Sequence, residues 1–215
     1  MRNGGILGVA HGLKEAADVI GWTYREIDGQ DTVAGQAAGL SQAIALKPDA
    51  IVVGGSDAVQ QKVGLQDAAK QGVVIVGWHA GPKPGPMEGA PVFANVTTDS
   101  MEVAKVAAMK AIADSNGTAG VVVFADSAYA IAIAKGRAME TQIKKCAGCK
   151  VLAFEDTPLA DTANRVPQLT TTLLQQFGDK WTHSLAINDL YYDSMGPSLQ
   201  GCQPCMLSGS GTVAA

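Results

Sequence analysis

Short apolar runs alternate with amphipathic stretches of about ten or more residues along most of this chain. This alternation is typical of repeated βα units, in which parallel strands are buried on both faces by helices. We expect helices over residues 9–20, 33–46, 57–71, 101–114, 129–144 and 164–177. We expect strands over residues 22–27, 50–53, 73–77, 92–96, 121–124, 151–154, 185–187 and 205–207. The pattern therefore predicts an α/β fold with doubly wound parallel sheets.

The alternation of predicted strands and helices is interrupted at residues 79–91, a segment rich in glycine and proline. We expect an extended surface loop there. We interpret this interruption as the passage from one lobe to another. The expected division is an N-terminal lobe over residues 1–97, a C-terminal lobe over 98–209, and the start of a return crossing over 210–215.

The order of the predicted elements places a helix first and a strand close to the end. Because βα units normally open with a strand, we expect that a strand before Asn3 and a closing portion after Ala215 are missing. The sheet position beside residues 22–27 would then be an exposed edge. Such an edge favours self-association by strand exchange.

Composition narrows the classes of partner. The chain has 16 Lys and Arg against 20 Asp and Glu, a net charge of −4, and no run rich in basic residues. Nucleic acids and anionic membrane surfaces both attract concentrated positive charge, so neither is the expected partner. No apolar stretch reaches the ~18 residues needed to span a bilayer. We therefore expect a small-molecule ligand.

The four cysteines form two pairs, Cys146-x-x-Cys149 and Cys202-x-x-Cys205. Two CxxC motifs can hold zinc, but these lie far apart in the sequence and no histidine follows closely. Local disulfides in an oxidising compartment and reduced thiols are the alternatives, and the sequence leaves all three open.

Catalytic motifs have little support. His11, His79 and His183 lie in separate segments without the spacing of a metal hydrolase, and no Gly-x-Ser-x-Gly motif occurs. Residues 209–214 match a Gly-x-Gly-x-x-Ala dinucleotide fingerprint, but the chain ends before the rest of a βαβ unit could follow. We expect no enzymatic activity and no cofactor.

Three segments resemble a known family. They are Asn3-Gly-Gly with Val9-Ala-His-Gly-Leu-Lys-Glu-Ala-Ala-Asp-Val-Ile-Gly-Trp22, then Pro48-Asp-Ala-Ile-Val-Val-Gly-Gly-Ser-Asp57, and Ala186-Ile-Asn-Asp189. Together they resemble the periplasmic sugar-binding proteins of ABC transporters, of the ribose-binding type. The resemblance implies two lobes that close around a small polar solute, a periplasmic location, and a membrane permease as partner.

The resemblance also implies a set of ligand-binding residues. Asn3 matches an asparagine after the family's first strand, and Asn188 matches its Asn-Asp signature. Trp78 and His79 stand where the family often has an Asp-Arg pair, and Lys135 lies near a frequent arginine. The remaining expected positions are Asp126, Ser127 and Ser210, the last in place of a common aspartate.

These departures bear on the ligand. Losing the Asp-Arg pair removes charge-assisted hydrogen bonds to sugar hydroxyls, whereas Trp78 offers an apolar face for stacking. A modified sugar, a polyol or an aromatic solute suits such a site better than a simple aldopyranose.

Each candidate also has a purely structural interpretation. Asn3, Asp126 with Ser127, and Asn188 are suited to cap helices. Trp78 could belong to the core, His79 could be exposed in its loop, and Lys135 could be a solvated helix residue. The effector-binding domain of a lac-repressor-type regulator is the alternative function, and it would need a helix-turn-helix before Asn3.

Overall fold

The computed structural model describes residues 4–30, 32–199 and 206–207. Those residues form two compact units, which are divided between Asp99 and Ser100. Both units are built from parallel strands and helices, so the predicted α/β class is confirmed. None of the helices within these ranges is long and apolar enough to cross a membrane.

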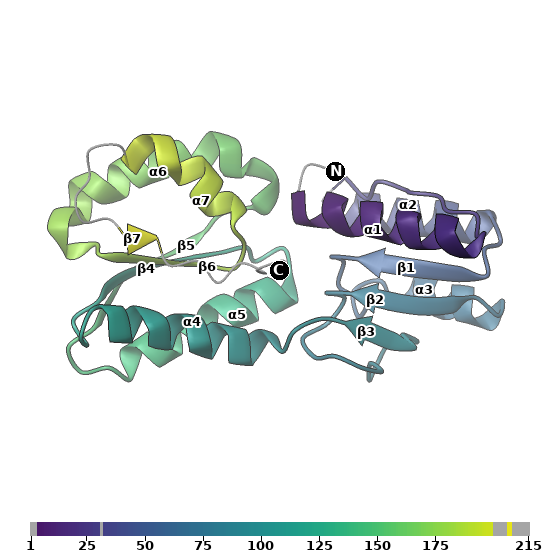
Figure 1. Cartoon of the computed structure of the whole chain (residues 1–215), viewed down its shortest axis with the longest axis horizontal. Helices are drawn as coiled ribbons and strands as arrows, with labels where there is room; N and C mark the ends of the chain where they lie inside the picture. Colours follow the sequence, from purple (N-terminus) through teal and green to yellow (C-terminus); the bar gives the residue numbers. More distant parts are fainter. Residues whose placement is uncertain (1–3, 31, 200–205, 208–215) are drawn as a thin grey trace. The chain divides into compact units, whose positions relative to one another are not determined.

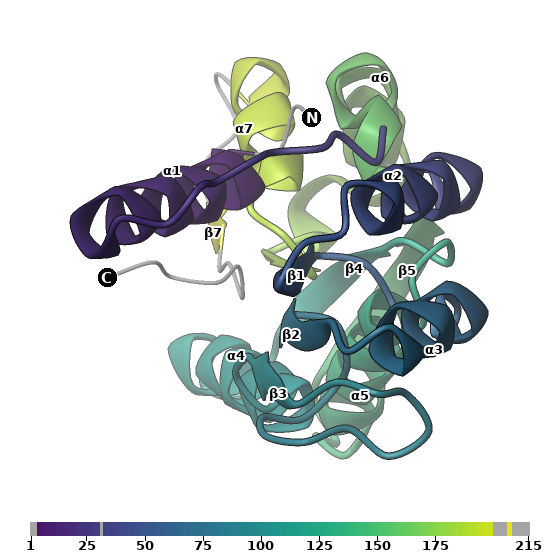
Figure 2. The same ribbon diagram turned by 90° about the vertical axis from the view of Figure 1, so that its right-hand side faces the viewer.

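The first unit contains a three-stranded parallel sheet in the order β1-β2-β3. Its elements are α1 (Gly4–Ile20), α2 (Val33–Ala45), β1 (Ala50–Gly54), α3 (Lys62–Lys70), β2 (Val74–Trp78) and β3 (Ala94–Val96). Figures 1 and 2 place α2 and α3 on one side of this sheet and α1 on the other. The core lies on the side of α2 and α3, where Ile51, Ile75 and Leu65 are buried.

The opposite face of this sheet is apolar but poorly covered. Val52 in β1 is 42% exposed and Val74 in β2 is 48% exposed. Their neighbours Ile51 and Ile75 are 8% and 1% exposed, because successive side chains of a strand point to opposite faces. Burial in the first unit is therefore one-sided.

The second unit contains a four-stranded parallel sheet in the order β5-β4-β6-β7. Its elements are α4 (Ser100–Asp114), β4 (Gly120–Ala125), α5 (Ala130–Lys144), β5 (Lys150–Asp156), α6 (Thr162–Phe177), β6 (His183–Ala186), α7 (Leu190–Met195) and β7 (Met206–Leu207). Figure 1 shows α4 and α5 on one face and α6 and α7 on the other. Every residue of β4 is buried, as its unbroken apolar run predicts.

The residues of β4 divide between two apolar clusters. Val122 and Phe124 pack with residues of α6 and α7, whereas Val121 and Val123 pack with residues of α4 and α5. The second unit is thus a three-layered sandwich around one central strand, and this rigid centre positions the loops that follow its strands.

One predicted strand is wrong. Residues 22–27 form no regular element, and Trp22 is 68% exposed. A strand is stable only when a neighbour pairs with its backbone, and no described strand pairs with this segment. The sheet edge that we expected beside it, and with it the basis for strand exchange there, is absent from the described part of the chain.

Smaller differences concern element ends and one loop. The helix expected from residue 57 begins only at Lys62, since the Asp57 carboxylate accepts hydrogen bonds from the N–H groups of Val59 and Gln60 in a preceding turn. The segment 79–91 is irregular as expected, but the side chain of Asn95 ties it down. Residue 205 of the last predicted strand lies outside the described residues.

Candidate functional site

The carboxyl edge of the second sheet gathers four of the predicted residues. Asp126 and Ser127 follow β4, Asn188 follows β6, and Lys135 lies in α5. Loops at this edge are where open α/β sheets usually bind ligands. The predicted positions Asn3 and Ser210 lie outside the described residues.

Asp126 organises this edge. Its side chain is 2% exposed, and its two carboxylate oxygens accept hydrogen bonds from the N–H groups of Ala128 and Leu159, each at 2.8 Å. Asp126 thereby joins the loop after β4 to the loop after β5. Its carboxylate thus has a structural role, but it does not cap α5 as the structural interpretation predicted, because the N-cap of that helix is Tyr129.

Asp156, at the end of β5, is a polar residue of this edge that the sequence analysis did not identify. Its Oδ1 accepts a hydrogen bond from the Ser127 N–H at 2.9 Å. Hydrogen bonds from the hydroxyl and the backbone N–H of Ser127 lower the pKa of this carboxyl group. The signal was available, because Asp156-Thr157 follows an apolar strand just as Asp126-Ser127 does.

Lys135 is buried rather than solvated, with 8% of its surface exposed. Its Nζ donates a hydrogen bond to the Ile187 carbonyl oxygen at 3.3 Å. Burial lowers the pKa of this lysine to about 8, although the negative charge of Asp189 opposes the shift. The Lys135 amino group is therefore held against the backbone of the loop after β6, at the residue that precedes Asn188.

Asn188 forms a turn at the start of α7. Its Oδ1 accepts a hydrogen bond from the Leu190 N–H at 3.0 Å. The N-cap position of α7 is occupied by Asp189, so Asn188 closes the turn that enters the helix, and this bond fixes the orientation of its side-chain amide. The Nδ2 group of Asn188 is a hydrogen-bond donor whose direction this bond determines.

Two further residues stiffen this edge. The buried Tyr191 donates a hydrogen bond from its hydroxyl to the Thr157 carbonyl oxygen at 2.6 Å. Burial raises the pKa of Tyr191, and the charges of Asp126 and Asp156 add to this effect. The buried Thr157 Oγ1 has no hydrogen-bond partner among the described residues.

The carboxyl edge of the first sheet brings Trp78 and His79 together. Their ring centroids are 4.7 Å apart and their planes are nearly perpendicular, at 85°. Both side chains are half-buried. Trp78 therefore belongs to neither a closed core nor an open surface, which leaves it able to contact a ligand.

Asn95 in β3 secures this second edge. The residue is 2% exposed, and its amide accepts from the Ala80 N–H and donates to the carbonyl oxygens of Gly81 and Lys83. Gly77 permits the approach, because a Cβ there would lie 2.8 Å from Asn95 Oδ1. The sequence analysis did not identify Asn95.

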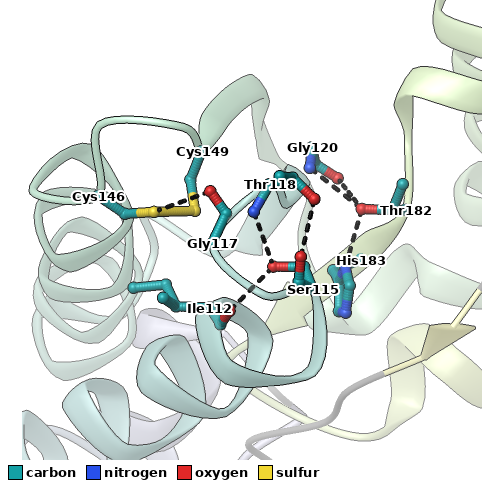
Figure 3. Close-up of a disulfide and its surroundings, with 9 residues drawn as sticks. All are labelled: Ile112, Ser115, Gly117, Thr118, Gly120, Cys146, Cys149, Thr182 and His183. Atoms are coloured by element: carbon teal, nitrogen blue, oxygen red, sulfur yellow. Dashed lines mark hydrogen bonds between the residues drawn. A yellow bond between two sulfur atoms is a disulfide. The ribbon is translucent and has the colours of Figure 1, made fainter.

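Of the two cysteine pairs, one is a disulfide. Cys146 at the end of α5 is bonded to Cys149 before β5, and Cys146 Sγ lies 3.4 Å from the Gly117 carbonyl oxygen (Figure 3). Cys202 and Cys205 lie outside the described residues. Within the described ranges, no group of three or more His, Cys, Asp or Glu side chains is placed to hold a metal ion.

The chain matches the sequence profile of the periplasmic binding protein domain over residues 3–204. It belongs to this family. No match was found among curated proteins. The ribose-binding type named above is a finer division than this match establishes.

Solved structures agree on the fold. A galactofuranose-binding protein is 17% identical, with a TM-score of 0.75, and the match covers 92% of this chain and 66% of that one. The 5-methylthioribose transporter solute-binding protein of Thermotoga lettingae is 14% identical, with a TM-score of 0.79 and coverages of 95% and 62%. The Caulobacter myo-inositol-binding protein is 15% identical, with a TM-score of 0.76 and coverages of 92% and 66%. This chain thus spans about two thirds of the length of each.

Proposed function

We propose that this chain is a solute-binding protein of an ABC import system, which captures a sugar or a similar small polar solute and delivers it to a membrane permease. It acts by binding and not by catalysis. The observation that carries the proposal is the cluster at the carboxyl edge of the second sheet. There Asn188, Lys135 and Ser127 offer donors and Asp156 offers an acceptor, on loops fixed by Asp126.

This set of groups suits a polyhydroxylated ligand. Hydroxyl groups both donate and accept, so they pair with an amide, an ammonium group and a carboxylate at once. In the first unit, Trp78 offers an aromatic surface for the C–H face of a sugar ring. The similar structures named above were solved for proteins that bind a furanose, a methylthio-sugar and a cyclic polyol, and they support this class of ligand.

The Cys146–Cys149 disulfide favours an extracytoplasmic location, because disulfides persist in oxidising compartments. It therefore supports a periplasmic transport role over a cytoplasmic effector-binding domain. Asn3 and Ser210 remain predicted ligand-binding residues.

Thermal unfolding with a panel of neutral sugars and polyols tests the proposal, since a ligand that binds only the folded state raises the melting temperature. The panel includes 5-methylthioribose, D-allose and myo-inositol. We expect at least one solute to stabilise the protein. A cooperative melt that no member of the panel shifts would refute the proposed function.

Asn188→Asp is the informative variant. The aspartate keeps an oxygen that can accept from the Leu190 N–H, so the turn before α7 survives, but the amide donor is lost. We expect about tenfold weaker binding with little change in the melting temperature of the free protein. Asp179→Asn, an exposed change after α6, is the matched control and should leave binding unchanged.

A further inference from the structure

Helix α4 ends in a turn whose hydrogen bonds engage an Asn-Gly pair. The Asn116 N–H donates to the Ala113 carbonyl oxygen at 3.0 Å, and the Gly117 N–H donates to the Ile112 carbonyl oxygen at 2.8 Å. The φ angle of Asn116 is +49°, in the left-handed region. These are the two hydrogen bonds and the left-handed residue of a Schellman motif, which closes the C-terminus of many helices. Asparagine suits this position because it adopts the left-handed conformation more readily than most residues.

An asparagine that precedes a glycine is open to deamidation. The backbone nitrogen of the glycine loses its proton and attacks the side-chain carbon Cγ of the asparagine. The N–Cγ bond forms, the Cγ–Nδ2 bond breaks, and the amide group takes up a proton and leaves as ammonia. Water then opens the five-membered succinimide ring to give aspartate or isoaspartate. Asn116 is exposed to this water, and glycine has no side chain to obstruct the attack.

The closed turn opposes the reaction. The proton of the Gly117 N–H is engaged by the Ile112 carbonyl oxygen, so this hydrogen bond must break before the nitrogen attacks. Thr118 strengthens the turn, because its hydroxyl donates to the Ser115 carbonyl oxygen at 2.7 Å and its N–H donates to Ser115 Oγ at 3.3 Å. Deamidation of Asn116 therefore requires local opening of the turn.

The Cys146–Cys149 disulfide lies against the same turn. Cys146 Sγ is 3.4 Å from the Gly117 carbonyl oxygen (Figure 3). The loop that the disulfide closes also brings Gly148 onto this oxygen, since a Cβ added at Gly148 would collide with it. A disulfide restricts the conformations open to the residues that it links. The oxidised loop is thus a rigid support for the turn.

We propose that Asn116 is a deamidation site gated by this disulfide. While Cys146 and Cys149 are bonded, their loop holds Gly117 in the Schellman turn and the Asn116 side chain persists. When they are reduced, the loop loosens, the Gly117 nitrogen is released more often, and Asn116 is converted to aspartate or isoaspartate. The product carries a negative charge at the C-terminal end of α4, where the helix dipole disfavours it. This modification is independent of the solute that the protein binds.

Peptide mapping by mass spectrometry tests the proposal. The whole chain is incubated in mildly alkaline buffer, oxidised or reduced, and the forms of residue 116 are quantified over time. We expect deamidation to be about fivefold faster in the reduced protein, the effect of losing one contact of ordinary hydrogen-bond strength. The chain unfolded in urea gives the unprotected rate. Equal rates in the oxidised and reduced proteins overturn the inference, and so does an Asn116 that stays intact in the unfolded chain.

Hydrogen exchange separates opening of the turn from unfolding of the whole unit. On reduction, the Gly117 amide should exchange about fivefold faster, while the amide of Val123 in the buried strand β4 keeps its protection. Equal acceleration at both amides overturns the gate, because reduction would then act through global unfolding.

Gly148→Ala opens the turn while the disulfide stays intact. Its methyl group displaces the Gly117 carbonyl oxygen, so Asn116 should deamidate about fivefold faster in this oxidised variant than in the oxidised wild type. Gly196→Ala is the matched control, because a Cβ there meets no described atom within 4 Å, and it should leave the rate unchanged. An oxidised Gly148→Ala protein that deamidates at the wild-type rate overturns the inference.

Discussion

Substitution of His79 by glycine and by alanine measures the strain at the edge of the first sheet. Both variants lose the same ring contacts with Thr97 and Trp78, so their difference reports the backbone alone. In ordinary conformations glycine is the less stable of the two by about 0.5–1 kcal/mol. At a φ angle of +50°, alanine pays a steric cost of about 1–2 kcal/mol that glycine avoids. We therefore expect His79→Gly to be more stable than His79→Ala by about 0.5–1 kcal/mol.

The stability of both variants relative to the wild-type protein follows from the contacts that they lose. The hydrogen bond to Thr97 contributes about 1 kcal/mol and the edge-on packing with Trp78 about 0.5–1 kcal/mol, partly offset in the glycine variant by relief of strain. Wild type should be the most stable, followed by His79→Gly and then His79→Ala. Urea unfolding followed by circular dichroism gives the three free energies. An alanine variant as stable as the glycine variant would mean that the backbone at His79 is not strained, and the reasoning above would fail.

Three further predictions concern the second unit. Lys135→Met should stabilise the protein by about 1–3 kcal/mol at pH 7, because the pKa of Lys135 is about 8 in the folded state and 10.5 in the unfolded state. The charged lysine therefore lowers the stability of the wild-type protein below pH 8, and this loss is regained as the pH rises from 8 to 10.5. Urea unfolding of both proteins at several pH values checks this, and a difference in unfolding free energy that does not change with pH would contradict it. Burial lowers the pKa of His183, so the stability of the wild-type protein should fall as the pH decreases below about 6.5. His183→Gln should abolish this fall in melting temperatures measured over a series of pH values. If the variant keeps the pH profile of the wild-type protein, His183 is not the group that causes the fall. Replacing Cys146 and Cys149 by serine should cost about 2 kcal/mol, since the disulfide closes only a short loop, and comparison with the reduced wild-type protein provides the control.

The fold was predictable where burial leaves a local pattern in the sequence. The buried strand β4 reads as an unbroken apolar run, and α6 reads as an amphipathic stretch, because each needs only its own periodicity to be recognised. Residues 22–27 have the same local character but form no strand. A strand also requires a partner, and the partner is a property of the tertiary structure that no local pattern contains.

The site was predictable only in part for a similar reason. Asp126 and Asn188 could be placed at this sheet edge because each directly follows an apolar strand. The residues that hold these loops could not. Thr97 contacts His79 across 18 positions, and Asp156 accepts from Ser127 across 29. Such pairs depend on which strands are neighbours in the sheet, so the sequence offers the chemistry but not the pairing.

The polar groups at the two sheet edges fall into two functional sets. Asp126 and Asn95 are buried, and their side chains are committed to backbone groups of the loops that they hold. Asn188 represents the second set, because its Oδ1 accepts from the Leu190 N–H and this bond fixes the direction of the Nδ2 donor. Preorganised groups of this kind lose little entropy when a solute binds. Substitutions in the first set should therefore lower stability and affinity together, whereas changes such as Asn188→Asp should lower affinity alone.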